Sequence, residues 1–120
     1  MAQELSSLTD RLEQARSRIA AVAQSRKRVQ AQMTALEQEE TKLARQAAVA
    51  RKLGREDLAL KAHAREQEAQ TQRAGLAVQL GQLLDEQARL TSRAQRLQAA
   101  RARIYWFGLP GQDGEDPVAT

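Results

Sequence analysis

Apolar residues recur at alternating steps of three and four along most of the chain, and this repeat limits the possible folds more than any other feature. On a helix, such spacing forms a narrow stripe that packs against another helix, as in a coiled coil, rather than a broad face for a globular core. The stripe is interrupted in the first half by Arg26 and Glu40, and in the second half by Glu66, Arg73, Gln87 and Arg101. We call this stripe the seam, and its main members are Leu12, Ile19, Val29, Met33, Leu36, Leu76, Leu80, Leu83, Leu90 and Leu97.

The repeat breaks near the middle of the chain, at residues 53–57, where the sequence favours a reversal. Gly54 suits the left-handed residue that ends a helix. Glu56 and Asp57 place negative charge in the first turn of the next helix, where the helix dipole favours it. We therefore predict an all-α fold, a long antiparallel two-helix coiled-coil hairpin with a short disordered C-terminal tail. The predicted tip residues are Gly54, Arg55, Glu56, Asp57, Leu58 and Ala59.

The predicted hairpin covers residues 1–105, with arms at about 3–53 and 56–105, and a flexible acidic tail covers residues 106–120. A dimer of straight helices would bury the same seam without any turn, but the tip sequence argues against it.

The repeat also predicts which residues face each other in the hairpin. Glu40 and Arg73 fall within about one helical turn of each other, so neither charge is buried alone. Both ends of the seam finish together, as a hairpin requires. The predicted facing pairs are Leu5 with Ile104, Leu12 with Leu97, Ile19 with Leu90, Val29 with Leu80, and Met33 with Leu76.

The charge of the chain is uneven. The net charge is +4, but residues 105–120 contain three acids and no base, which leaves +7 on the remainder. A solvated basic face is the simplest interpretation. An anionic membrane surface or an acidic neighbouring subunit would also fit. Nucleic acid fits less well, because no aromatic residues are interleaved with the bases for stacking.

The residues needed for common site chemistry are missing. The chain has no cysteine, and His63 is the sole histidine, without a second ligand at metal-binding spacing. Carboxylate pairs occur, but a two-helix rod offers no concave site that would tune their pKa. We therefore expect no enzyme activity, no cofactor and no metal. The N-terminal residues do not resemble a secretory signal and no apolar run is long enough to span a bilayer, so the expected location is the cytoplasm, with peripheral attachment to the inner face of the cell membrane as an option.

All aromatic residues of the chain form one run at residues 105–107, where the second arm ends. Gly108 follows and is expected to stop the helix. In one interpretation the rings fold over Leu5 and Leu8 and cap the open end of the hairpin. In the other they form an anchor at a membrane boundary or a docking element, because Trp and Tyr are enriched in both settings. These candidate anchor residues are Tyr105, Trp106 and Phe107.

The tip carries the segment Gly54-Arg55-Glu56-Asp57-Leu58-Ala59 followed by Lys61-Ala62, and the first arm carries Leu12-Glu13-Gln14-Ala15-Arg16. Together with the helical pattern on both sides, these residues resemble the coiled-coil hairpin of the phage shock protein A family, which includes the vesicle-inducing proteins of plastids and belongs to the bacterial ESCRT-III-like group. The resemblance covers roughly residues 8–104.

In that family the hairpin is the core of a membrane-remodelling subunit that polymerises under envelope stress, and it can also inhibit an AAA+ transcription activator. Members usually have a short amphipathic helix before the hairpin and further helices after it. Here about four residues precede the first seam position, and Leu43 stands where the first arm commonly has a tryptophan. The resemblance implies a hairpin that assembles with like hairpins.

Two hypotheses of different classes follow. In the first, the chain associates with itself or with full-length relatives at the cytoplasmic membrane face, using exposed apolar residues outside the seam. In the second, it is a soluble adaptor or inhibitor that presents its tip or its aromatic run to one protein, such as an AAA+ regulator. The off-seam residues that the first hypothesis needs are Ala21, Ala31, Ala35, Ala77, Val78 and Leu84.

Overall fold

The computed structural model describes residues 2–108, and within them the fold consists of two α-helices with no strand. Helix α1 spans Ala2–Lys52 and helix α2 spans Glu56–Phe107. The predicted all-α fold is confirmed. Helix α2 continues through Phe107, so the first two residues of the predicted tail are helical. The rest of that predicted tail, residues 109–120, lies outside the described residues.

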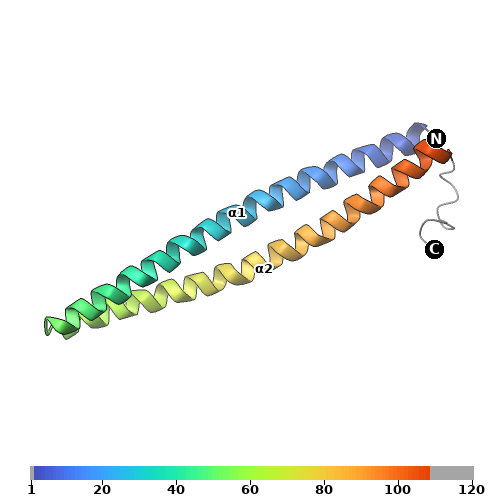
Figure 1. The fold of residues 1–120 in the computed structure, drawn as a ribbon. Helices are drawn as coiled ribbons and strands as arrows, with labels where there is room; N and C mark the ends of the chain where they lie inside the picture. The colour runs from blue at the N-terminus through green and yellow to red at the C-terminus, as the bar shows by residue number, and fades with distance from the viewer. Residues whose placement is uncertain (1, 109–120) are drawn as a thin grey trace. The chain divides into compact units, whose positions relative to one another are not determined.

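The chain divides into two compact units, one formed by Met1–Ala23 with Asp85–Thr120 and the other by Gln24–Leu84. Each unit contains a length of α1 and a length of α2 running in opposite directions. In the second unit, α1 leads directly into α2 at the turn (Figure 1). In the first unit, the beginning of α1 lies beside the end of α2 (Figure 1).

At the turn, a C-cap ends helix α1, and helix α2 begins directly after it. Gly54 has a φ of 72°, the left-handed conformation that glycine adopts without steric cost. The Arg55 amide donates to the Ala50 carbonyl at 2.8 Å and the Gly54 amide donates to the Arg51 carbonyl at 3.0 Å, the two bonds of a Schellman motif. The Arg55 carbonyl then accepts the first bond of α2, from the Ala59 amide at 3.1 Å. These backbone N–H and C=O groups at the reversal therefore have hydrogen-bond partners within the turn and the adjoining helix ends.

In the unit that contains the turn, the buried seam residues are mostly alanines, together with Leu43 and Val29. Met33 and Leu36 on α1 are half-buried, whereas Leu43 is 3% exposed and Val29 is 5% exposed. Because an alanine side chain is small, one neighbouring helix covers it, whereas several larger side chains of this seam keep part of their surface in water. On α2, Leu76, Leu80 and Leu83 are half-buried. The buried alanines of this unit are Ala47, Ala50, Ala59, Ala62 and Ala69.

The other unit is built around Leu12, whose relative exposure is 0%. Ile104 near the end of α2 is also buried, whereas Ile19, Leu90 and Leu97 are half-buried. An ion pair joins the helices beside this seam, with Arg18 Nη2 donating to Glu86 Oε2 at 2.7 Å. Both side chains are partly exposed, so the seam contributes more to stability than the ion pair does.

Helix α2, like α1, is followed by a glycine with a positive φ. Gly108 has a φ of 62°, and its amide donates to the Ile104 carbonyl at 2.8 Å, the single bond of a left-handed helix cap. The expectation that Gly108 stops the helix is confirmed.

Gly54→Ala and Gly75→Ala are expected to change stability in opposite directions. A Cβ atom at either position meets nothing within 4 Å, so only the backbone conformation decides the outcome. Alanine in the left-handed conformation of Gly54 is expected to cost about 1 kcal/mol of unfolding free energy. Alanine in the helical interior at Gly75 is expected to add roughly 0.5 to 1 kcal/mol. Urea denaturation followed by circular dichroism measures both, and Gly81→Ala is the matched control that should behave like Gly75→Ala. Equal shifts at positions 54 and 75 would contradict the turn geometry.

Leu12→Glu is expected to destabilise the protein by at least about 3 kcal/mol, because it removes a fully buried side chain and leaves a charge in its place. Leu90→Glu should cost less, because Leu90 is half-buried and a carboxylate there reaches water. The exposed Glu13→Ala serves as the control and should change the free energy of unfolding by no more than about 0.5 kcal/mol. Thermal melts of the three variants test this order. Equal melting temperatures would contradict the burial of Leu12 and Leu90 between the two helices.

Candidate docking surface beside the turn

Helices α1 and α2 share an open groove of about 620 Å³ next to the turn, entirely within the unit Gln24–Leu84. We call it the turn groove. Its surface is mostly apolar, which is unusual for an open surface on so polar a chain. The residues that line it are Lys42, Leu43, Arg45, Gln46, Val49, Ala50 and Leu53 of α1 and the segment that follows it, and Leu58, Lys61, Ala62 and Arg65 of α2.

Three large apolar side chains of the turn groove are exposed to solvent. The relative exposure is 55% for Val49, 72% for Leu53 and 43% for Leu58. These residues are not part of the buried seam, and they lie together instead of singly. Exposed apolar clusters of this kind commonly mark sites of association.

The turn groove is also basic. Lys42 and Arg45 lie on α1, Lys61 and Arg65 lie on α2, and no acidic residue is among the lining residues. All four cations are exposed, and none forms an ion pair within residues 2–108. A groove with an apolar floor and unpaired cations on both helices attracts negative charge.

At the turn itself, Arg55 and Asp57 neutralise each other. Arg55 Nη2 lies 3.3 Å from Asp57 Oδ2, and this hydrogen bond lowers the pKa of the Asp57 carboxyl below its ordinary value of 3.8. Because the folded-state pKa is lowered, the contribution of the pair is fully present above pH 3.8 and is lost as the pH falls through the lowered pKa. Arg55 therefore does not add to the free positive charge of the turn groove.

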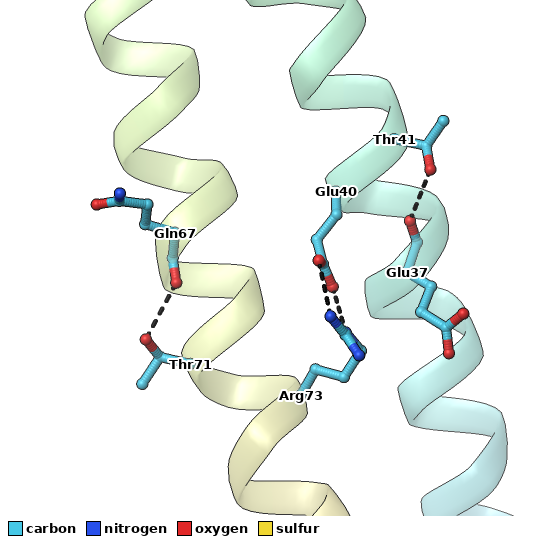
Figure 2. A network of polar contacts seen from close by, with 6 residues as sticks. All are labelled: Glu37, Glu40, Thr41, Gln67, Thr71 and Arg73. Carbon is cyan, nitrogen blue, oxygen red and sulfur yellow. Dashed lines mark hydrogen bonds and ion pairs between the residues drawn. The ribbon is translucent and has the colours of Figure 1, made fainter.

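The predicted meeting of Glu40 and Arg73 is confirmed. Arg73 Nε donates to Glu40 Oε2 at 2.6 Å and Arg73 Nη2 donates to Glu40 Oε1 at 3.2 Å, a two-pronged contact across the seam (Figure 2). The bond to Glu40 raises the pKa of the Arg73 guanidinium above its already high ordinary value. Nearby, Thr41 and Thr71 donate to the carbonyls of Glu37 and Gln67 within their own helices (Figure 2). The ion pair is thus the polar link between α1 and α2 at this level.

The other charged interruption of the first half of the seam has no such partner. Arg26 is half-buried, and its Nε is shielded from solvent without a hydrogen-bond partner in the described part of the chain. A buried donor without a hydrogen-bond partner lowers stability. Arg26 therefore weakens the packing of α1 against α2, whereas the Glu40–Arg73 ion pair strengthens it.

The aromatic run is exposed at the end of α2. The exposures are 68% for Tyr105, 77% for Trp106 and 65% for Phe107, and the first two rings contact each other edge to face at 5.5 Å. Tyr105 and Trp106 line a groove beside Leu5, but they are not buried against it. Such exposure differs from the expected cap, in which the rings would be buried over Leu5 and Leu8. They stay available for contact with another molecule.

The described residues, 2–108, contain no cluster of side chains that could hold a metal ion. No three potential metal-ligating side chains gather there. His63 is half-exposed, with Nδ1 3.5 Å from Glu66 Oε1 and Nε2 3.2 Å from the Gln67 amide. Its neighbours are those of a surface residue on a helix.

Sequence reasoning identified part of this surface and missed the rest. All ten predicted seam residues are buried or half-buried, and the tip residues other than Ala59 are exposed around the turn. The grouping of Val49 and Leu53 with Leu58 was not predicted. The available signal was the spacing of Val49 and Leu53, an apolar pair four residues apart on a face that is otherwise polar.

Comparison with models of known protein families, with curated proteins and with solved structures finds no match. Neither helix, within the described part of the chain, has an apolar stretch long enough to cross a membrane. The resemblance to the phage shock protein A family therefore stays a prediction from the sequence.

Neutral substitutions of Arg26 and Glu40, two charged residues of the seam, are expected to change stability in opposite directions. Arg26→Leu should stabilise the protein by roughly 1 kcal/mol, because it removes an unmet donor and adds apolar contact. Glu40→Gln should lower the melting temperature, because it weakens the link to Arg73. Glu39→Gln, at an exposed position beside Glu40, is the matched control and should have no measurable effect. A melting temperature of Glu40→Gln equal to that of the control would contradict a role of the ion pair in stability.

Proposed function

We propose that this chain is a non-enzymatic coiled-coil protein that acts by associating with other helical chains, either further copies of itself or full-length proteins of the phage shock protein A type. By the same resemblance, the place of action is the cytoplasmic face of the membrane, in the envelope stress response or its regulation.

The observation that supports this proposal most is the incomplete burial of the seam. Apart from Leu12 and Val29, the main seam residues are half-buried between only two helices. Further helices packed beside the seam would remove this apolar surface from water, at about 25 cal/mol for each Å² covered. Association with like hairpins satisfies that requirement directly.

Apolar residues outside the seam add to the surface that association would cover. Val78 is 64% exposed and Leu84 is 45% exposed, both on the part of α2 that lies within Gln24–Leu84. The expected off-seam alanines Ala31, Ala35 and Ala77 are exposed in the same unit. Small residues on an exposed helix face permit close approach of another helix.

Contact with a membrane surface is supported by charge and by the aromatic run. The chain without residues 105–120 carries a net charge of +7, which an anionic lipid surface attracts. Exposed Tyr105 and Trp106 are residues that favour the boundary between water and lipid.

A second candidate function is favoured by the turn groove. A soluble adaptor or inhibitor that binds one protein, such as an AAA+ regulator, needs a defined concave site with an apolar floor and charged walls. The turn groove has both features. Lipid would play no part in this function.

Mass measurement by multi-angle light scattering after size exclusion, with and without anionic liposomes, tests the first function. We expect large or lipid-bound species, and we expect Val78→Gln combined with Leu84→Gln to reduce their mass, because both side chains are exposed. Gln82→Ser, at an exposed polar position between them, is the matched control. A wild-type monomer or small oligomer that ignores liposomes would contradict assembly and favour the adaptor.

A further inference from the structure

The turn groove is long enough to bind one more helix, and its lining residues are suitably spaced along α1 and α2 for helix packing. Its lining residues on the α1 side include Lys42, Arg45, Val49 and Leu53, at steps of three and four, and those on α2 include Leu58 at a similar spacing before Lys61 and Arg65. This spacing places them along one edge of each helix. From Lys42 to Leu53 the edge is about 17 Å long at 1.5 Å per residue, which corresponds to about three helical turns of a partner.

The floor and walls of the turn groove differ in chemistry. Val49, Leu53 and Leu58 supply exposed apolar surface, and the seam alanines Ala50 and Ala62 lie between them and add little bulk. The four cations Lys42, Arg45, Lys61 and Arg65 come from both helices, so positive charge lies on both edges of the groove, farther from the turn than Leu53 and Leu58. A ligand that fits must carry an apolar stripe with negative charge on either side of it.

We propose that the turn groove binds an acidic amphipathic helix of a partner protein. The partner's apolar residues, spaced three and four apart, pack on Val49, Leu53 and Leu58. Its flanking Glu or Asp side chains pair with the cations on the two walls. This inference rests on the adaptor function and deepens it by naming the chemistry of the partner and the site that recognises it.

The geometry favours a helix over a lipid surface as the occupant. The apolar floor lies in a groove between two helices, and a helix of about 10 Å diameter reaches it along its whole length. A bilayer surface contacts only what projects from the protein, whereas a helix lying in the groove also reaches Ala50 and Ala62 between the two edges. The four cations and the absence of any acidic residue from the lining favour an acidic partner helix over a basic one.

Binding is tested with a defined probe, an amphipathic peptide of about 18 residues that carries Leu in a heptad stripe, Glu at the flanking positions and Ala elsewhere. The peptide is labelled with fluorescein, and its anisotropy is measured against the full chain at low and high salt. We expect micromolar binding that weakens at least about fivefold in high salt, because the pairing is electrostatic. A peptide with every Glu replaced by Lys should not bind.

Two variant pairs locate the site. Leu53→Gln and Lys61→Glu should each weaken binding about tenfold, because they remove a floor contact and reverse a wall charge. Leu60→Gln and Lys27→Glu are the matched controls and should bind like the wild type, because Leu60 is 63% exposed but does not line the turn groove and Lys27 is exposed elsewhere on α1. All four positions are exposed, and circular dichroism checks that each variant is folded.

Several outcomes would overturn the inference. These are no binding at protein concentrations up to about 0.5 mM, equal binding of the Lys peptide, or binding that the Leu53 and Lys61 variants leave unchanged. Competition by phosphatidylglycerol vesicles that requires Leu53 and Lys61, without binding of the Glu peptide, would assign the turn groove to lipid instead. The adaptor function itself fails by a different result, namely large lipid-bound assemblies in light scattering, so the two failures are distinguishable.

Discussion

Two helices packed along a single apolar stripe leave part of the surface of most large stripe residues uncovered, and the other properties of this protein depend on that limit. Leu12 is fully buried in the seam, with a relative exposure of 0%. Leu80, Leu90 and most other seam leucines are half-buried. The fold is therefore held by a narrow strip of contact along two long helices and not by a closed core. A structure of this kind keeps part of its apolar surface available to other molecules, and the association proposed for this protein would use that surface.

Much of the fold could be predicted because each decisive feature is local in the sequence. The seven-residue repeat predicts the helices and the seam, and Gly54 marks the turn because the left-handed conformation that it adopts is rare for other residues. The pairing of Glu40 with Arg73 follows from the register. The end of α2 was placed too early, at residue 105, because the aromatic run carries no repeat to extend the helix, whereas the cap at Gly108 decides the boundary.

The turn groove was harder to predict because it depends on side chains that the turn brings together from two helices. Val49 and Leu53 precede the turn and Leu58 follows it, and each alone is an unremarkable exposed residue. The composition of the seam contributes as well. Where Ala50, Ala59 and Ala62 replace leucine, the seam has little bulk with which to cover neighbouring apolar residues. Binding chemistry and turn chemistry thus occupy the same short stretch of chain, although different residues carry them.

The position of the turn also determines how much chain each contact between the helices encloses. The Glu40–Arg73 pair closes a loop with a sequence separation of 33, whereas the Arg18–Glu86 pair has a separation of 68. Closing the larger loop from an open chain costs only about 0.6 kcal/mol more for each doubling of length, and it costs still less once the shorter one has formed. Contacts near Gly54 therefore close the shorter loops, and each contact farther from the turn gains from the ones already made nearer to it.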